Sequence, residues 1–423
     1  MEKKERNAAY ISILKEELIP AMGCTEPIAL AYAAAYAREV LGVEPDKVTV
    51  EASGSIIKNV KSVIVPNTDF MHGIDAAAAA GIVAGDAAKK LEVLAAVTPE
   101  QTKAIKSFME RVAITVKHIE KGCMFDIIVT LEKGASYSKV RIANQHTNIV
   151  LVEKDGQKLV DKGVVEVKGG LTDRSSLNLA DIWDFITTVD VEEIKGLLKT
   201  QVEYNYAIAQ EGLRGDYGGN IGKVLLATYG DKDVAVRAKA MAAAGSDARM
   251  NGCEEPVVIN SGSGNQGITV AVPIKVYADE LKVSEEKLYR ALALGNLVGI
   301  HEKTGIGVLS AYCGAVSAGA GAGAGIAYLC GSDYAGVCAT VSNALAILSG
   351  TICDGASASC AAKIAASVEA GILGYKMHLA DKKFNAGDGI VGKDVEETIA
   401  NVGRLAKEGM EKTNNVIIQI MIQ

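Results

Sequence analysis

The feature that most constrains the fold is an uncharged stretch, residues 305–331, composed mainly of glycine, alanine and serine. Its length would allow a membrane span, which needs roughly 20 apolar residues. However, large aliphatic side chains are few in it, and no Lys/Arg cluster or Trp belt flanks it. Small side chains instead allow helix backbones to approach closely. We therefore expect a buried helix among closely packed helices, and no membrane partner.

Composition narrows the class of protein further. The chain has 423 residues, of which 49% are hydrophobic, so it can bury a large core. Its net charge of −7 argues against nucleic-acid binding. The N-terminal segment MEKKER is not followed by an apolar signal sequence, which predicts a cytoplasmic protein. Eight cysteines in that reducing compartment favour metal binding or catalysis over disulfides. A homo-oligomer is compatible with this sequence.

Hydrophobic periodicity predicts an α+β fold: a mostly helical catalytic domain with an inserted or adjoining smaller α+β domain. The expected domains are N-terminal helices that pack on the catalytic domain (1–45), the α+β domain (46–175) and the helical, cluster-binding domain (176–423). Helices are predicted at 7–20, 28–41, 76–90 and 99–112, and helical patterns dominate from 177 onward. Strands are predicted at 48–52, 56–65, 114–118, 126–131, 138–142 and 148–152. Residues 415–423 read as a β-like or buried tail.

Three late cysteines, Cys313, Cys353 and Cys360, are the strongest candidates for chemistry. Three thiolates can hold a [4Fe–4S] cluster and leave one iron without a protein ligand. The small residues around them permit the close backbone approach that a cluster needs. Their spacing matches neither a ferredoxin signature nor a zinc CxxC pair, so three buried structural cysteines are the alternative. Structural packing is expected for the remaining late and central cysteines, Cys123, Cys253, Cys330 and Cys338.

Cys24 lies in the segment Gly-Cys-Thr-Glu-Pro, just before a predicted helix. Thr25 is a plausible N-cap of this helix, and Pro27 suits its first turn. A thiol beside a helix N-terminus has a lowered pKa and can act as a base. We therefore expect Cys24 to be catalytic; the alternative is a fourth cluster ligand that the substrate displaces.

Polar segments in both halves suggest a site for a small amino acid. The segment Ser-Gly-Ser-Gly-Asn-Gln-Gly, residues 261–267, exposes backbone N–H groups that suit a carboxylate, although a tight turn between helices explains it equally well. Lys58 or Asn59 could bind the carboxylate or amine, unless Lys58 is merely an exposed strand residue. His146, between two predicted strands, is either a substrate contact or a satisfied turn histidine. The candidate substrate-binding residues are Ser55, Lys58, Asn59, His146, Ser261, Ser263 and Asn265.

Together, these motifs resemble the L-cysteine desulfidase family, which is related to the α-chain of iron–sulfur L-serine dehydratases. The resemblance rests on residues 23–27, 53–59, 145–148 and 261–267 and on the Cys-Asp-Gly segment that begins at Cys353, and it covers nearly the whole chain. It implies an oxygen-sensitive [4Fe–4S] enzyme that eliminates hydrogen sulfide from L-cysteine and yields pyruvate and ammonia. Cys313, Cys353 and Cys360 match the cluster ligands of the family, and Cys24 matches its proposed proton acceptor.

Three departures from bacterial single-chain serine dehydratases favour the desulfidase branch. The last two cluster cysteines are closer together, a Ser-Ser-Ser-His segment is missing, and the chain ends in Gln423 without a terminal cysteine. These departures do not fix the leaving group, so an L-serine dehydratase on the same cluster stays an alternative. A non-enzymatic iron–sulfur sensor is a third hypothesis, but a sensor has no need for carboxylate-binding loops.

Overall fold

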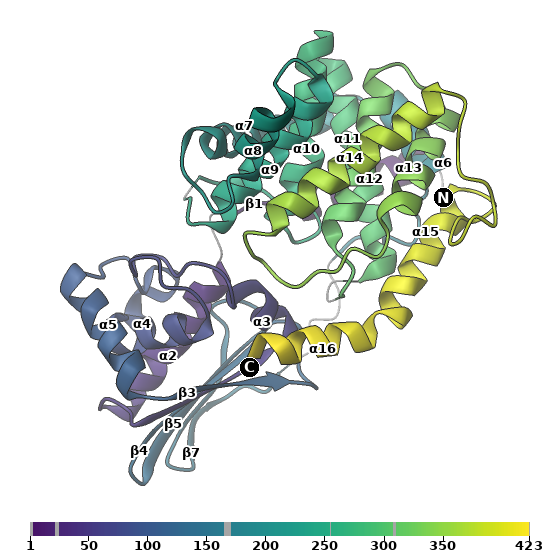
Figure 1. Cartoon of the computed structure of the whole chain (residues 1–423). Coiled ribbons are helices and arrows are strands. Elements are labelled where there is room, and N and C mark those ends of the chain that lie inside the picture. The colour runs from purple at the N-terminus through teal and green to yellow at the C-terminus, as the bar shows by residue number, and fades with distance from the viewer. Residues whose placement is uncertain (1–2, 22–24, 165–170, 254, 308–309, 423) are drawn as a thin grey trace. The chain divides into compact units, whose positions relative to one another are not determined.

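The computed structural model describes residues 3–21, 25–164, 171–253, 255–307 and 310–422. The chain divides into two compact units (Figure 1). A helical unit contains residues 1–23, 170–353 and 358–414, and an α+β unit contains residues 24–169, 354–357 and 415–423. The protein is thus α+β and mostly helical, as the periodicity predicts.

The helical unit begins with α1 (Lys3–Glu17), followed by the short strand β1 (Pro20–Ala21), which pairs antiparallel with β8 (Val257–Val258). Its other helices are α6 (Leu179–Thr188), α7 (Glu192–Arg214), α8 (Ile221–Tyr229), α9 (Val234–Met250), α10 (Gly264–Leu281), α11 (Glu285–Ile306), α12 (Gly314–Leu329), α13 (Tyr334–Leu348), α14 (Cys360–Leu379), α15 (Val395–Arg404) and the π-helical turn η2 (Leu405–Gly409). α16 (Glu411–Ile422) begins in this unit and ends in the other.

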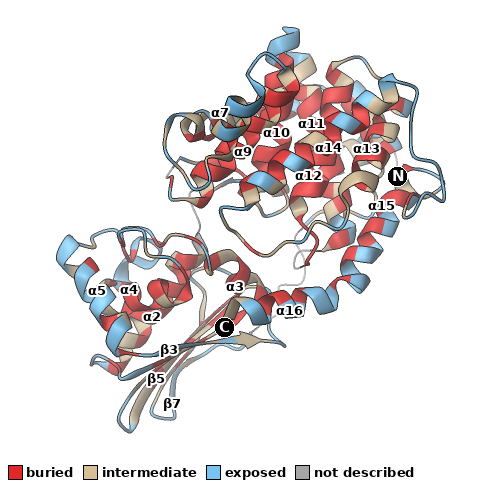
Figure 2. Ribbon diagram, in the orientation of Figure 1, coloured by how far each residue is buried: buried red, intermediate tan, exposed pale blue. Residues whose placement is uncertain are grey.

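Helix α12 forms the centre of the helical unit and packs against α10, α11, α13 and α14 (Figure 2). It is buried almost throughout, as expected for the uncharged stretch. A Cβ at Gly321 would lie 2.3 Å from the carbonyl oxygen of Gly295 on α11, and one at Gly319 would lie 2.4 Å from that of Ser367 on α14. The small residues therefore let these helices pack backbone against backbone. None of the helices in the described ranges has the length and apolar character needed to cross a membrane.

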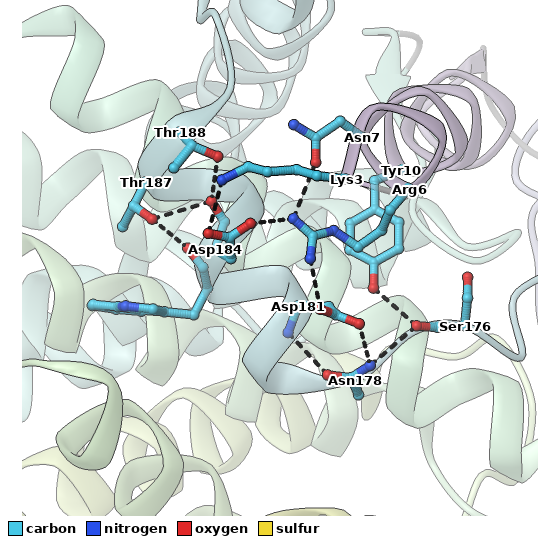
Figure 3. A network of polar contacts seen from close by, with 11 residues as sticks. Lys3, Arg6, Asn7, Tyr10, Ser176, Asn178, Asp181, Asp184, Thr187 and Thr188 are labelled. Carbon is cyan, nitrogen blue, oxygen red and sulfur yellow. Dashed lines mark hydrogen bonds and ion pairs between the residues drawn. The ribbon is translucent and has the colours of Figure 1, made fainter. Parts of the chain in front are cut away.

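Polar contacts attach α1 to α6 within the helical unit (Figure 3). The Arg6 guanidinium donates to Asp181 at 2.7 Å and to Asp184, and the Tyr10 hydroxyl donates to the Ser176 carbonyl at 2.9 Å. The Tyr10 side chain is also fully buried. α1 consequently belongs to the helical unit.

The α+β unit is built on a six-stranded sheet of order β3-β2-β4-β5-β6-β7. Only β2 and β3 pair in parallel; the other neighbours are antiparallel. The strands are β2 (Lys47–Ser53), β3 (Ile114–Ile119), β4 (Asp126–Lys133), β5 (Ser136–Ala143), β6 (Ile149–Lys154) and β7 (Gln157–Asp161), and the helices are α2 (Thr25–Leu41), α3 (Gly54–Val60), α4 (Ile74–Ala84), the 3-10 helix η1 (Ala87–Glu92) and α5 (Pro99–Arg111). α2 packs on β4, β5 and β6 and against α4. The buried side chains of these elements form the core of the unit.

Two local predictions need correction. The strand expected at 56–65 is wrong, because residues 54–60 form α3. The Ser53 hydroxyl accepts a hydrogen bond from the Ile56 amide and so caps this helix, an effect that outweighs the β-branched residues. The tail that was expected to be β-like or buried is helical, and Ile418 on it is fully buried in the core of the α+β unit.

The unit boundaries differ from those expected from the sequence. The expected N-terminal domain, 1–45, is divided between the units, since α1 joins the helical unit and α2 packs on the sheet. Residues 354–357 also belong to the α+β unit, where the Ala356 amide donates to the Lys58 carbonyl at 2.8 Å.

Candidate active site

The three candidate ligand cysteines lie at helix starts and in one connecting segment of the helical unit. Cys313 is the N-cap residue of α12, and Cys360 is the first residue of α14. Cys353 is the last residue of the helical unit before the chain passes through residues 354–357. None of the seven cysteines in the described part of the chain forms a disulfide.

Backbone hydrogen bonds hold the segments of Cys313 and Cys353 together. The Cys313 amide donates to the Thr351 carbonyl at 3.0 Å, and the Cys353 amide donates to the Ala311 carbonyl at 2.6 Å. The residues between these bonds form an isolated antiparallel bridge. A short two-stranded arrangement therefore fixes the two thiols relative to each other before any ligand binds.

The Cys313 thiol interacts electrostatically with the other two candidate thiols. The pKa of Cys313 is raised to about 12, mainly by burial and also by like-charge repulsion from Cys353 and, more weakly, from Cys360. The Ala315 amide and Lys363 act in the opposite direction. Cys313 is only 8% exposed, whereas Cys353 and Cys360 are partly exposed. An added cationic centre would reverse this repulsion, because metal binding favours thiolates.

The residues fit an iron–sulfur cluster in donor type and grouping. In the described ranges, no group of three or more His, Cys, Asp or Glu side chains is arranged to hold a single metal ion. A cluster, however, distributes its protein ligands over separate irons, so its thiolates stand further apart than the ligands of one ion. Small residues, Gly314 and Ala315, follow Cys313 directly and allow close backbone approach.

The loop at 261–267 leads into α10, and its two serine hydroxyls are engaged within the protein. Ser263 caps α10 by accepting from the Gln266 amide at 3.4 Å. Ser261, in the left-handed region at φ +50°, donates to the Asn260 side chain at 2.8 Å. Of the three predicted substrate contacts in this loop, Asn265 is the one on the first turn of α10, where its side-chain oxygen accepts from Arg249 at 3.3 Å.

A network of buried side-chain amides is linked to this loop through Asn260, which accepts from Ser261. The Asn260 side chain donates to Asn296 at 2.8 Å, and Asn296 and Gln201 exchange hydrogen bonds of 2.8 and 2.9 Å. All three side chains are buried, so the network is shielded from water and its geometry is well defined. These amides come from distant segments, so nothing in the sequence pattern links them.

Two further buried polar groups approach the first turn of α12. The Gln266 carboxamide, 7% exposed, lies where a side chain at Gly314 would be, with its atoms 2.6–2.8 Å from that Cβ position. Glu302 on α11 is 1% exposed, and both carboxylate oxygens lack a hydrogen-bond partner in the described part of the chain. Burial raises the pKa of Glu302 well above its usual value; Ser317 lies close enough to oppose this, but outside hydrogen-bond geometry.

In the α+β unit, two of the four predicted residues, Asn59 and His146, interact with Glu26. Asn59 donates to Glu26 at 3.3 Å, and Glu26 raises the pKa of His146, although burial, the larger effect, lowers it overall. Lys58 is 3% exposed, which contradicts the alternative that it is an exposed strand residue. Ser55 lies half-buried on α3.

Sequence reasoning missed four residues of these sites: Glu26, Arg249, Gln266 and Glu302. Glu26 and Gln266 lie within the motifs 23–27 and 261–267, so the neighbouring candidate residues could have drawn attention to them. Arg249 and Glu302 carry no signal in the sequence, because helices are rich in charged residues that face solvent. The predicted catalytic residue Cys24 lies outside the described residues.

These features define an α+β protein whose helical unit carries Cys313 as the N-cap of the glycine-rich helix α12 and Cys360 as the first residue of α14. The serine dehydratase alpha chain model matches residues 88–419, and this chain belongs to that family. Among its relatives, a UPF0597 protein of Desulfitobacterium hafniense is 55% identical over 100% of this chain and 98% of its own length. UPF0597 proteins of Lachnoclostridium phytofermentans and Treponema denticola are 52% and 46% identical, over 97% and 99% of this chain and 99% of each relative.

Proposed function

We propose that this protein is an iron–sulfur-dependent L-cysteine desulfidase, a carbon–sulfur lyase. It would convert L-cysteine and water into pyruvate, ammonia and hydrogen sulfide. The observation that carries this proposal is the backbone pairing of the Cys313 and Cys353 segments, with Cys360 close enough to interact electrostatically with Cys313. Membership of the serine dehydratase alpha chain family supports a lyase that acts on a small amino acid.

Cys313, Cys353 and Cys360 would hold a [4Fe–4S] cluster as thiolates. When bound, such a cluster with three protein ligands supplies a Lewis-acidic iron that stabilises the departing β-substituent. The chain's own contribution is to hold the segments of Cys313 and Cys353 together through the backbone pairing of 311–313 with 351–353 and to exclude water around Cys313. Cys360 would complete the ligand set from the first residue of α14.

The elimination also needs a base that removes the α-proton. Cys24 is our candidate, on the basis of its place just before α2, which begins at Thr25, and of the family resemblance. The thiolate form would be favoured at a helix N-terminus. In this proposal the α-proton passes to the Cys24 thiolate, and the β-sulfur leaves as HS⁻, which takes up that proton to become hydrogen sulfide. The 2-aminoacrylate product then hydrolyses with water to pyruvate and ammonia.

In the helical unit, Asn265 with Ser261 and Ser263 are our candidate substrate-binding residues. In the α+β unit, the candidates are Ser55, Lys58, Asn59 and His146. Because burial lowers the pKa of His146, its imidazole is neutral near pH 7 and can donate or accept a hydrogen bond. The hydroxyls of Ser261 and Ser263 are engaged within the loop, so their contribution would be to shape it.

The test is anaerobic purification, followed by measurement of iron, acid-labile sulfide and visible absorption, and then addition of L-cysteine or L-serine. A desulfidase binds a cluster and releases sulfide and pyruvate from L-cysteine at a higher kcat/KM than pyruvate from L-serine. The family match favours L-serine dehydratase as the second candidate, and the reverse preference would establish it. Iron binding without turnover of either amino acid would indicate a sensor.

A further inference from the structure

Arg249 has no carboxylate partner among the residues that the structure describes, and its guanidinium lies beside the N-terminus of α10. It lies on the last turn of α9, and its guanidinium occupies the space beside Gly264, the first residue of α10. A Cβ at Gly264 would be 2.4 Å from Nε and 2.8 Å from Cζ of Arg249. Only glycine leaves room for this guanidinium.

Arg249 forms few hydrogen bonds for a guanidinium, which has five N–H donors. Its side chain donates to the Asn265 oxygen at 3.3 Å, and Nε is buried without a hydrogen-bond partner. Within the part of the chain that the structure describes, no ion pair involves Arg249. The last turn of α9 stabilises its charge, and beside the N-terminus of α10 this charge adds to the positive end of the helix dipole, which favours the binding of an anion there.

The N-terminus of α10 offers further donors to such an anion. Ser263 caps the Gln266 amide, but over the described residues no carbonyl or side chain accepts from the amides of Gly264 and Asn265. Two backbone N–H groups and a guanidinium are the donor set that a carboxylate takes. The loop and the amide network beneath it hold these donors in place.

Gln266 provides the second, independent sign of a ligand. Its carboxamide is more than nine-tenths buried and forms no hydrogen bond with the described residues, although it lies against Gly314, next to Cys313. Residues two apart in a helix project about 200° apart, so Arg249 at Gly264 and the Gln266 side chain flank the helix end from opposite sides.

We infer that Arg249 and the Gly264 and Asn265 amides bind the α-carboxylate of the substrate, and that Gln266 orients its other end beside Cys313. This inference rests on the proposed function and deepens it. It makes the substrate a small amino acid with an unmodified carboxylate, so esters and decarboxylated amines are excluded. Arg249 is then the residue that selects for the anion.

The first test is binding by calorimetry to the full chain purified without a cluster. The probe is L-alanine, which has no leaving group, and cysteamine, which has no carboxylate, is its counterpart. Arg249→Gln should weaken L-alanine binding by about 10- to 100-fold, the range for loss of a hydrogen-bonded charge, and leave cysteamine unaffected. The affinity of Arg249→Lys for L-alanine should lie between those of wild type and Arg249→Gln. A lysine keeps the charge but loses the planar guanidinium that binds a carboxylate through two N–H groups. Arg237→Gln, on the same helix but in an ion pair with Glu280, is the matched control and should bind as wild type.

The second test is steady-state sulfide release from the cluster-loaded enzyme. Arg249→Gln should raise KM for L-cysteine by about 10- to 100-fold with little change in kcat, since the carboxylate contact is equal in the ground and transition states. It should also abolish the preference for L-cysteine over its methyl ester. Gln266→Leu should lower kcat, because it removes orientation, and should leave the preference for the acid intact.

The outcomes separate the two proposals. Equal binding of L-alanine by wild type and a folded Arg249→Gln variant, or no binding of L-alanine by wild type, overturns the carboxylate subsite. If wild type releases no sulfide from L-cysteine, the desulfidase proposal fails. In that case weaker binding of L-alanine by Arg249→Gln still supports the subsite.

Discussion

The Cys353 amide donates a 2.6 Å hydrogen bond to the Ala311 carbonyl, two residues before Cys313. This bond ties the segment that ends the helical unit at Cys353 to the start of α12. Because the bond is made by backbone atoms, replacing the Cys353 side chain leaves the local fold intact. The thiol can therefore be tested separately from the structure that carries it.

We predict that Cys353→Ser, purified anaerobically, loses most of its iron and visible absorption, since a hydroxyl is a poor substitute for a thiolate ligand. Its thermal unfolding without the cluster should match that of wild type. Cys338→Ser is the matched control, because Cys338 on α13 interacts with Tyr334 and lies outside the thiol group. Equal iron in wild type and Cys353→Ser would remove Cys353 from the ligand set.

The burial of Asp247 should make the stability of the helical unit depend on pH. Asp247 is 1% exposed and accepts one hydrogen bond, from the Gly222 amide at 3.3 Å, while its other oxygen has no partner in the described ranges. Burial raises its pKa from 3.8 to about 6. The native state then holds the proton more tightly than the unfolded state, so stability is highest below about pH 4 and falls until about pH 6.

The loss amounts to at most about 3 kcal/mol, from a shift of roughly two pKa units. Asp247→Asn should remove this slope and be more stable than wild type at pH 8, but not at pH 4. Fluorescence of Trp183, the single tryptophan and a residue of the helical unit, reports urea unfolding of that unit. Asp231→Asn, at an exposed loop, is the control and should keep the wild-type slope. A pH slope that survives in Asp247→Asn would contradict the prediction.

Glu302 should act in the same direction through a different helix. Burial raises the pKa of this carboxyl well above its usual value, so ionisation at high pH destabilises the native state. Glu302→Gln keeps the shape and neutrality of the protonated acid. It should match wild type near pH 5 and resist urea better than wild type at pH 9, with Trp183 fluorescence as the measurement. A variant less stable than wild type at both pH values would show that Glu302 has an ionic partner in the native protein.

Much of the architecture could be predicted from periodicity, and the exceptions have physical causes. Five of the six predicted strands lie in the sheet, because alternation reports a half-buried face directly. The exception, 56–65, has β-branched residues but follows a serine that caps a helix. The exposed edge strand β7 lacks an apolar pattern, so it was not predicted.

The candidate site was predictable where chemistry is carried by rare residue types. Cysteines in a glycine-rich stretch attract notice, whereas an arginine such as Arg249 does not. Its meaning depends on Gly264, which leaves the space that the guanidinium fills, and this contact between helices has no local sequence pattern. The same holds for Glu302, whose burial is set by the packing of α11 on α12.

We predict that position 355, between Cys353 and Cys360, cannot accommodate a methyl group in place of the hydrogen of Gly355. Its φ is +101°, and an added Cβ would lie 2.5 Å from the Lys58 carbonyl oxygen. Gly355→Ala should therefore cost more than the roughly 1–3 kcal/mol of backbone strain alone. Gly350→Ala is the control, because Gly350 also has a positive φ, +123°, but nothing lies within 4 Å of its Cβ position. Equal free energies of unfolding for the two variants would show that the contact with Lys58 is not maintained.

The last prediction concerns a buried ion pair in the sheet. Asp126 is fully buried, and its carboxylate accepts two hydrogen bonds from Arg141, at 2.8 and 2.6 Å, across the β4–β5 pair. Arg141→Gln leaves the Asp126 charge buried and uncompensated, which should destabilise the α+β unit by about 3–5 kcal/mol.

Lys133→Gln, on the same strand as Asp126, is the matched control. Lys133 pairs with Asp46 at 2.5 Å, but both side chains are largely exposed, so its loss should cost about 0–1 kcal/mol. Far-ultraviolet circular dichroism would follow both units during urea unfolding, while Trp183 fluorescence follows the helical unit alone. Arg141→Gln should shift the circular dichroism transition and leave the fluorescence transition in place. A fluorescence transition that moves with it would mean that the two units unfold as one.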